Sequence, residues 1–285
     1  MKVIRNPKLF QQEMERLRKR GRSIGFVPTM GALHQGHLSL VERSKKENDV
    51  TAVSIFVNPL QFGPKEDLKK YPRPITRDKS LLKKEGADYL FLPAAESMYG
   101  KDYDTVIEIG TLAKKSSLTD TLCGKSRPGH FRGVATVVAK LFLLAKPNRA
   151  YFGSKDYQQS TVIKKLVMDL NFDIAIRVLP TVREKDGLAM SSRNQYLNES
   201  DRKRATALSQ TLFWIKSQIK NGERNLSRVK KMAYEKLSAR VDRIDYLELA
   251  DGTDLHPVTQ YQKNMVALTA CIVGKTRLID NVTIS

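Results

Sequence analysis

The sequence predicts an α/β protein, with a Rossmann-like doubly wound parallel sheet followed by a smaller α+β C-terminal domain. Apolar, β-branched runs alternate with segments of helical periodicity from residue 8 to residue 179. The run 50–57 is almost continuously apolar, which is typical of a strand buried on both faces of a parallel sheet. After residues 180–181, helices are followed by a succession of short strands. We therefore expect two domains, 1–182 and 183–285.

The expected elements of the first domain begin with a helix over 8–21, which ends at Gly21. A strand over 23–27 follows and is closed by Pro28. Further helices are expected over 37–44, 78–84, 134–144 and 158–168, and further strands over 50–57, 89–92, 149–152 and 173–179.

The second domain opens with a polar turn over 183–187. Its remaining elements are helices over 201–220 and 226–239, and strands over 246–249, 265–273 and 277–279.

The composition excludes a disordered tail and a disulfide miniprotein, because 285 residues with 41% hydrophobic side chains can bury a sizeable core. Fifty Lys and Arg against thirty Asp and Glu give a net charge of +20. That excess is compatible with a nucleic-acid surface, a membrane face, anionic small molecules or solubility. The basic clusters 16–22 and 202–204 contain no aromatic platform for stacking bases, so we expect a solvated surface and no nucleic-acid partner.

The chain shows no signal for a membrane. No apolar run approaches the ~20 residues that a membrane span needs, and the residues after Met1 form no hydrophobic leader. Cys123 and Cys271 are far apart in sequence and belong to no CxxC pair, which argues against structural zinc. These features predict a cytoplasmic protein with no membrane partner.

The segment 28–37 lies between the first long strand and the next helix. In open α/β sheets this position offers backbone N–H groups and a positive helix end to phosphate. His34 and His37 are three residues apart, and the residues between them, Gln35 and Gly36, do not fit the HExxH metal motif. A pair of structural histidines is one interpretation. The position after the strand, with glycines that allow close backbone approach, favours phosphate contact.

This segment resembles the HIGH-type motif of the nucleotidylyltransferase superfamily, whose members attack the α-phosphorus of ATP. Other motifs are similar, in the same order, to those of the pantothenate synthetase (pantoate–β-alanine ligase) family. They are Ser54–Phe62, Tyr71–Arg73, Arg127–Val134, Phe152–Gln159, Asp186–Asn194 and Leu278–Asn281. Six motifs in register over the whole chain make the resemblance specific.

The resemblance implies an enzyme of pantothenate and coenzyme A biosynthesis. In this family (R)-pantoate attacks ATP to give pantoyl adenylate and pyrophosphate, and β-alanine then attacks the acyl carbon, which yields pantothenate and releases AMP. No protein nucleophile is required, so catalysis consists of orienting the reactants and stabilising charge on the phosphates.

The resemblance also implies the catalytic residues, which are His34, His37, Lys155 and Arg193, with His37 matching the family's proton donor. A lysine suits a point-charge contact to ATP phosphates, and the loop 190–193 is expected to close over the triphosphate. The expected ATP contacts are Met30, Gly31, Ala32, Leu33, His34, Gln35, Gly36, His37, Gly153, Ser154, Lys155, Asp156, Val182, Met190, Ser191, Ser192 and Arg193.

The resemblance implies that Gln61 and Gln159 are pantoate ligands, and amide side chains can bind a hydroxyl and a carboxylate without adding charge. Arg127 and His130 flank a Pro-Gly turn and are expected to support substrate binding. Mg²⁺ should accompany ATP, with Asp78 as the candidate protein ligand.

Three positions depart from the family pattern. Arg77 stands where some members carry a second acid beside Asp78, and Ser154 stands where a glutamate is common. Cys123 replaces the usual glutamate before Gly124 and is expected to be a bystander.

Two alternatives to the ligase stay open. One is a nucleotidylyltransferase that stops at an adenylated product, and the other is a nucleic-acid-binding protein on the same fold. The substrates expected for the ligase are ATP, pantoate and β-alanine, and the resemblance implies a homodimer and a lid function for the C-terminal domain.

Overall fold

The computed structural model describes residues 1–64, 66–110 and 118–284 and divides into two compact units. The first comprises the described residues within 1–113, 127–153 and 162–179. The second comprises those within 114–126, 154–161 and 180–285. The expected boundary after residue 182 lies close to Pro180, but two earlier segments also belong to the second unit.

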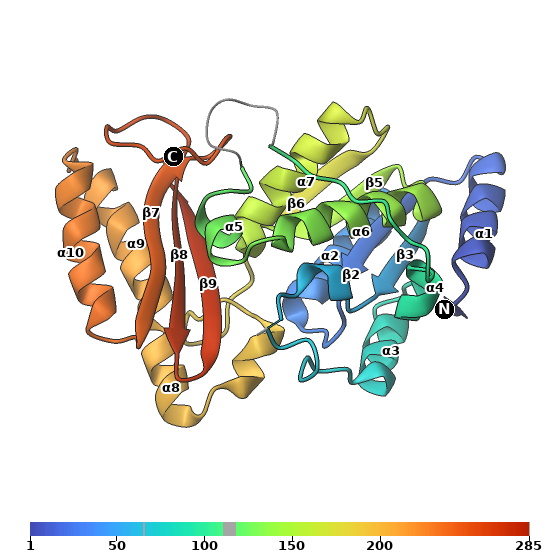
Figure 1. Cartoon of the computed structure of the whole chain (residues 1–285), viewed down its shortest axis with the longest axis horizontal. Coiled ribbons are helices and arrows are strands. Elements are labelled where there is room, and N and C mark those ends of the chain that lie inside the picture. Colours follow the sequence, from blue (N-terminus) through green and yellow to red (C-terminus); the bar gives the residue numbers. More distant parts are fainter. Residues whose placement is uncertain (65, 111–117, 285) are drawn as a thin grey trace. The chain divides into compact units, whose positions relative to one another are not determined.

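The first unit contains a six-stranded parallel sheet in the order β1-β4-β3-β2-β5-β6 (Figure 1). Its strands are β1 (Lys2–Ile4), β2 (Ile24–Thr29), β3 (Val50–Ile55), β4 (Tyr89–Phe91), β5 (Arg149–Gly153) and β6 (Ala175–Leu179). The strand order reverses at β2, which pairs with β3 on one side and β5 on the other. This arrangement confirms the predicted Rossmann-like α/β fold.

Helices connect these strands. They are α1 (Pro7–Lys19), α2 (Gln35–Glu47), α3 (Ile75–Lys84), α4 (Ala95–Met98), α6 (His130–Ala145) and α7 (Tyr157–Asp169), with a 3₁₀ turn η1 (Pro59–Gln61). Helix α1 begins where the side chain of Asn6 accepts a hydrogen bond from the N–H of Leu9, and Pro7 occupies its first position.

Both faces of this sheet are buried, and neighbouring residues of β2 serve opposite faces. Phe26 lies near Phe10 of α1, with ring centroids 6.5 Å apart, and Phe10 stacks on Phe91 of β4 at 4.4 Å. Val27 belongs instead to a cluster that includes Val41 of α2 and Leu82 of α3. Burial on both sides explains the nearly continuous apolar runs in the sequence.

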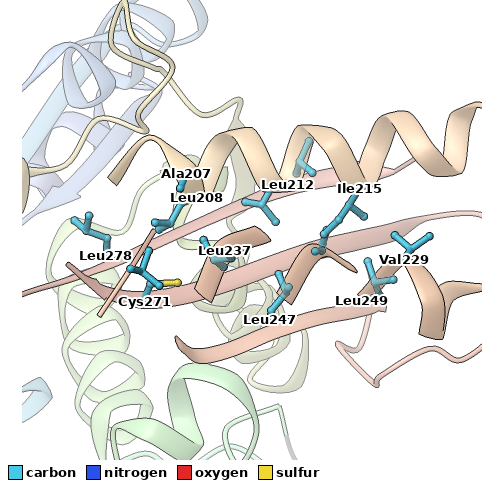
Figure 2. Close-up of a cluster of buried hydrophobic side chains, with 14 of the residues drawn as sticks. Ala207, Leu208, Leu212, Ile215, Val229, Leu237, Leu247, Leu249, Cys271 and Leu278 are labelled. Carbon is cyan, nitrogen blue, oxygen red and sulfur yellow. The ribbon is translucent and has the colours of Figure 1, made fainter. Parts of the chain in front are cut away.

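The second unit contains a three-stranded antiparallel sheet, β7-β8-β9. Its elements are α5 (Leu122–Ser126), η2 (Ser154–Asp156), η3 (Ser192–Tyr196), α8 (Glu199–Ala205), α9 (Ala207–Lys220), α10 (Leu226–Ser238), β7 (Arg243–Asp251), β8 (Met265–Val273) and β9 (Thr276–Ile284). Figure 2 shows Leu212 and Ile215 of α9 facing Leu247 and Leu249 of β7 in the buried core.

Several element bounds differ from the expected ones. The helix expected over 201–220 is two helices that meet at Thr206. The strand expected over 277–279 runs from Thr276 to Ile284, because its polar residues are paired inside the sheet. The edge strand β1 was not expected, since three residues leave too little pattern to recognise.

Candidate functional site

The loop after β2 begins at the carboxyl end of a central strand. Because β2 pairs with β3 and β5 on opposite sides, this end of β2 is the switch point of the sheet, where ligands of open α/β sheets bind. Thr29 donates from its hydroxyl to the carbonyl of Ser54 and accepts the N–H of Gly31. Gly31 has φ +81°, and a Cβ there would lie 2.9 Å from the Ile55 side chain, so this tight turn requires glycine.

The carboxylate of Asp78 holds this loop from α3. Its Oδ2 accepts the N–H of Ala32 at 2.8 Å and its Oδ1 accepts the N–H of Leu33 at 2.9 Å. The side chain is fully buried. Burial raises the pKa of Asp78, and the two N–H donors oppose that rise.

These contacts bear on the expected role of Asp78 as a magnesium ligand. Both oxygens of Asp78 are hydrogen-bonded to the backbone, so the geometry favours holding the loop over binding a cation. Among the described residues, no group of three His, Cys, Asp or Glu side chains could hold a metal ion.

The two histidines of the loop cap the start of α2, two residues earlier than the expected helix start. His34 Nδ1 accepts the N–H of Gly36 at 3.2 Å, and His37 Nδ1 accepts the N–H of His34 at 3.4 Å. Their ring centroids are 4.1 Å apart. Because each Nδ1 accepts a hydrogen bond, the neutral rings carry their protons on Nε2. An imidazole Nε2–H at the start of a helix is a donor of the kind that suits hydrogen bonding to phosphate.

Gln61 lies in η1, after the carboxyl end of β3, and its amide has a defined orientation. Asn58, which is 1% exposed, donates to Gln61 Oε1 at 3.1 Å and accepts the hydroxyl of Tyr99 at 2.8 Å. Gln61 Nε2 points to Met30 Sδ at 3.1 Å. The bond from Asn58 orients the amide, and the Nε2 group of Gln61 can then donate an N–H to a substrate oxygen.

The backbone of Gln61 is held by α6. His130 Nε2 accepts from Arg127 Nη1 at 2.9 Å, so His130 Nδ1 carries the proton and donates to the Gln61 carbonyl at 2.9 Å. Arg127 also binds Glu66 through two hydrogen bonds, of 2.8 and 2.6 Å. Gly133 lets α6 approach η1, because a Cβ there would collide with the Leu60 carbonyl.

Arg127 and His130 were expected to support substrate binding, either by holding an anionic group or by fixing the loop. Their observed contacts place the Gln61 backbone, and a direct contact to substrate stays a prediction. The contributions of Asn58 and Tyr99 were missed, although Asn58 stands in the motif quoted around Gln61. Only the fold brings Tyr99 to that motif.

In the second unit, Ser154, Lys155 and Asp156 form η2, directly after the end of β5. Lys155 Nζ lies 3.5 Å from Asp156 Oδ2, and the lysine side chain is 18% exposed. The next turn contains two glutamines with different surroundings. Gln158 is buried and donates to the carbonyls of Leu118 and Thr121, whereas Gln159 is half-buried.

The other predicted ATP contacts of the second unit lie on a short hairpin. The carbonyl of Val182 accepts the N–H of Met190 at 3.0 Å, and Arg183 forms an antiparallel bridge with Ala189. Ser191 then caps η3, where its hydroxyl accepts the N–H of Arg193 at 3.3 Å. The hairpin thus brings Val182 next to the segment 190–193, although these residues are separated in sequence.

The predicted residues therefore gather in two sets. The first unit holds the loop 30–37 with Gln61, Asp78, Arg127, His130 and Gly153, and the second holds Ser154, Lys155, Asp156, Gln159, Val182 and the segment 190–193. Within the part of the chain that the structure describes, no helix is long and apolar enough to cross a membrane.

These features define a Rossmann-like α/β protein whose candidate site lies at the switch point of the sheet. The family model described as pantoate-beta-alanine ligase matches residues 2–283. The chain belongs to this family, which confirms the resemblance seen in the sequence.

Similar proteins agree with this assignment. The pantothenate synthetase of Pseudothermotoga lettingae is 52% identical over 99% of this chain and 98% of its own length. That of Caldicellulosiruptor saccharolyticus is 51% identical over 95% of both chains.

Solved structures also match over nearly their full length. The pantothenate synthetase of Thermus thermophilus superposes with a TM-score of 0.93 at 42% identity, over 100% of this chain and 99% of that one. The pantoate-beta-alanine ligase of Francisella tularensis gives a TM-score of 0.82 at 37% identity, over 99% of this chain and 97% of that one. The Francisella structure is described as a complex with beta-gamma ATP and beta-alanine.

Proposed function

We propose that this chain catalyses the ATP-dependent condensation of (R)-pantoate with β-alanine, through a pantoyl-adenylate intermediate. Membership of the pantoate–β-alanine ligase family supports this activity. The structural observation that carries the proposal is the geometry of the loop 30–37. Gly31 forms its tight turn, the buried Asp78 of α3 holds its backbone, and two histidines cap the start of α2.

In the first step, a pantoate carboxylate oxygen attacks the α-phosphorus of ATP, and the bond from that phosphorus to the bridging oxygen breaks to release pyrophosphate. The Nε2–H groups of His34 and His37 donate to the phosphate oxygens, on which negative charge accumulates. Lys155 and Arg193 add positive charge toward the triphosphate, and the hydroxyls of Ser191 and Ser192 add donors.

Pantoate is held by the amide side chains of Gln61 and Gln159. The Gln61 amide offers N–H to a carboxylate or hydroxyl oxygen, because Asn58 fixes its oxygen. A neutral amide leaves the negative charge of the attacking carboxylate in place, which keeps that carboxylate nucleophilic. The rigid surroundings of Gln61 favour one orientation of pantoate against the phosphorus.

In the second step, the neutral amine of β-alanine attacks the acyl carbon of the adenylate. The C–N bond forms, the C–O bond to AMP breaks, and the amine loses a proton. AMP is a good leaving group, so this step needs no protein nucleophile.

Magnesium enters, in this proposal, as part of the MgATP substrate. The ion is then held by the triphosphate and water, as is usual for Mg²⁺ with nucleotides, and Asp78 shapes the loop without coordinating it.

The experiment that tests the function is ATP–pyrophosphate exchange with labelled pyrophosphate. We expect exchange that requires pantoate and proceeds without β-alanine, and AMP release that requires β-alanine as well. Pyrophosphate release with an adenylated product that accumulates, and no AMP release when β-alanine is added, would favour a nucleotidylyltransferase. Salt-sensitive binding to duplex DNA or RNA with no exchange would favour the nucleic-acid-binding alternative.

The expected homodimer, cytoplasmic location and absence of a nucleic-acid partner stay predictions.

A further inference from the structure

Two polar residues interrupt the apolar pattern of β9 in the second unit. Asp280 and Asn281 are neighbours in this strand, and they are 3% and 5% exposed. Because successive strand residues point to opposite faces, the two side chains serve opposite sides of the sheet. Asn281 meets the candidate ATP-binding turn that contains Lys155, and Asp280 meets the hairpin that leads to the segment 190–193.

Asn281 holds the turn that contains Lys155. Its Nδ2 donates to the carbonyl of Ser154 at 2.9 Å and to the carbonyl of Lys155 at 2.7 Å. Both N–H groups of one amide are therefore used on consecutive carbonyls of η2. Such a pair of bonds fixes the direction in which the backbone presents the Lys155 side chain.

Asp280 holds the hairpin that leads to the segment 190–193. Its carboxylate forms a bidentate pair with Arg183, at 2.7 and 3.0 Å. Arg183 also donates to the carbonyl of Gly187 at 3.1 Å, and its guanidinium lies 4.9 Å from the ring centroid of Phe213. The guanidinium thereby joins the first arm of the hairpin and its turn to β9.

The two anchors are coupled through one further contact. The N–H of Asn281 donates to Asp280 Oδ1 at 2.8 Å, so the carboxylate that binds Arg183 also accepts from the backbone of Asn281. A shift of β9 at this point would move η2 and the hairpin together.

We propose that Asp280 and Asn281 are positioning residues that set the spacing of Lys155 and the segment 190–193 for the ATP triphosphate. This inference rests on the proposed function, because it assumes that both segments contact ATP. Burying an ion pair and an amide contributes little net stability compared with apolar side chains of similar volume. Asn281 contacts one candidate phosphate-binding segment directly, and Asp280 contacts the hairpin that leads to the other, so their contacts indicate a role in geometry.

The test compares Asn281→Ala with Thr269→Val in the full-length protein. Thr269 is fully buried in β8, pairs with Asp280 across the sheet and donates to the carbonyl of Tyr246 at 2.9 Å. Thr269→Val therefore removes a buried hydrogen bond from the same sheet without touching η2. Both variants are measured by thermal melting and by pantoate-dependent ATP–pyrophosphate exchange.

We expect Asn281→Ala to raise the KM for ATP about tenfold and to lower the exchange rate at saturation about tenfold or more, because the Lys155 turn is misplaced. The KM for pantoate should stay within about threefold of wild type, and Thr269→Val should leave both KM values within about twofold. An Asn281→Ala protein with the KM for ATP of wild type would overturn the proposal.

A double-mutant cycle separates positioning from general stability. In a Lys155→Ala background, Asn281→Ala should change exchange by less than about twofold, because the positioned group is gone. The same loss in both backgrounds would show that Asn281 acts on stability alone and would overturn the proposal.

If Asn281→Ala fails to give a cooperative melt, Asn281→Ser replaces it, since a hydroxyl keeps one of the two donors. We then expect a KM for ATP raised about threefold, and a wild-type value would again contradict the proposal.

Measurements on the wild-type protein distinguish failure of the proposed function from failure of the positioning role. No pantoate-dependent exchange in wild type would refute the proposed function, whereas normal exchange in wild type and in Asn281→Ala would refute only the positioning role.

Discussion

The two sets of candidate residues are held in place by different means. The loop 30–37 is bounded by β2 and α2, is capped by its own histidines, and needs one outside carboxylate, that of Asp78. The Lys155 turn and the hairpin 182–190 are held by β9, with Asn281 lying 126 residues after Lys155 in sequence. The first arrangement is largely local, whereas the second depends on the assembly of the whole second unit.

Substitutions in the two sets should therefore differ in how many segments they displace. A change in the first loop should act on that loop alone, whereas a change in β9 should act on two segments at once. The following variants test this contrast, beginning with the largest expected effect.

The largest losses are expected from one residue in each set, His37 and Lys155. His37→Ala removes a phosphate donor and Lys155→Ala removes a phosphate charge, so each should lower pantoate-dependent exchange about 100- to 1,000-fold. Initial rates with labelled pyrophosphate measure the effect. Lys165→Ala is the matched control, because Lys165 is a partly exposed α7 residue whose Nζ pairs with Asp169 at 2.6 Å. Exchange near the wild-type rate in either site variant would remove that residue from the proposed site.

The anchor of the first loop should give a smaller loss. Asp78→Asn leaves one of the two backbone N–H groups without an acceptor, so we expect a KM for ATP about tenfold higher. The free energy of unfolding should fall by roughly 1–3 kcal/mol. Steady-state exchange and urea titration measure the two quantities.

Asp88→Asn provides the comparison for Asp78→Asn. Asp88 also accepts a backbone N–H, that of Thr51 at 2.8 Å, but on the β3 strand away from the loop 30–37. We expect its KM for ATP to stay within about twofold of wild type. Equal effects of the two variants on the KM for ATP would contradict a specific role of Asp78 in the loop.

A still smaller effect is expected at Tyr99, which acts on Gln61 through Asn58. Tyr99→Phe removes the hydroxyl that fixes the Asn58 amide, so the KM for pantoate should rise about threefold while the KM for ATP stays unchanged. Tyr151→Phe is the control, because that hydroxyl bonds Glu47 and Asn48 instead. A rise in the KM for ATP alone would refute the link to Gln61.

Glu13 lies outside both sets and should affect stability only. Hydrogen bonds from Arg16, and further ones from Tyr89 and Lys2, lower the pKa of Glu13 from 4.5 to about 2. A lowered pKa in the folded state means that the carboxylate stabilises the fold above pH 4.5 and loses this effect as the pH falls through about 2.

Glu13→Gln should therefore lower the melting temperature at pH 7 by a few degrees and leave exchange unchanged. Melting curves recorded from about pH 7 to about pH 2 should show the difference from wild type shrinking toward zero. A difference that does not depend on pH would contradict the role of the charged carboxylate.

The fold was largely predictable because its signals are local. The run 50–57 and the alternation of strands with helices reflect burial on both sheet faces, which any segment of the sequence reveals by itself. The break at Thr206 and the full length of β9 were not predictable in the same way. Asp280 and Asn281 are polar and look like the end of a strand until the partners that satisfy them are known.

In the candidate site, too, the features with local sequence signals were predictable and those that depend on tertiary contacts were not. The loop 30–37 was recognised from its place after a strand and from its motif, and the capping histidines lie three residues apart in sequence. The contacts of Asp78 could not be foreseen, because its partners Ala32 and Leu33 lie 46 and 45 residues earlier and contribute only backbone N–H groups. An isolated carboxylate near a nucleotide motif is easily assigned to magnesium.

The roles of Arg127 and His130 also depend on tertiary contacts. A guanidinium and an imidazole beside a Pro-Gly turn are compatible with binding an anionic substrate. Their observed partners are Glu66 and the carbonyl of Gln61, which only the folded chain brings near. Side-chain chemistry in the sequence therefore limits what a residue can do, and packing decides which partner it meets.

The adenylate pathway is tested most directly by the fate of the pantoate oxygens. Pantoate labelled with ¹⁸O in its carboxylate is incubated with the protein, ATP and β-alanine, and the AMP is analysed by mass spectrometry. If the carboxylate attacks the α-phosphorus and AMP then leaves by C–O cleavage, each AMP carries one oxygen from pantoate. AMP without label, or formation of ADP in its place, would contradict the account.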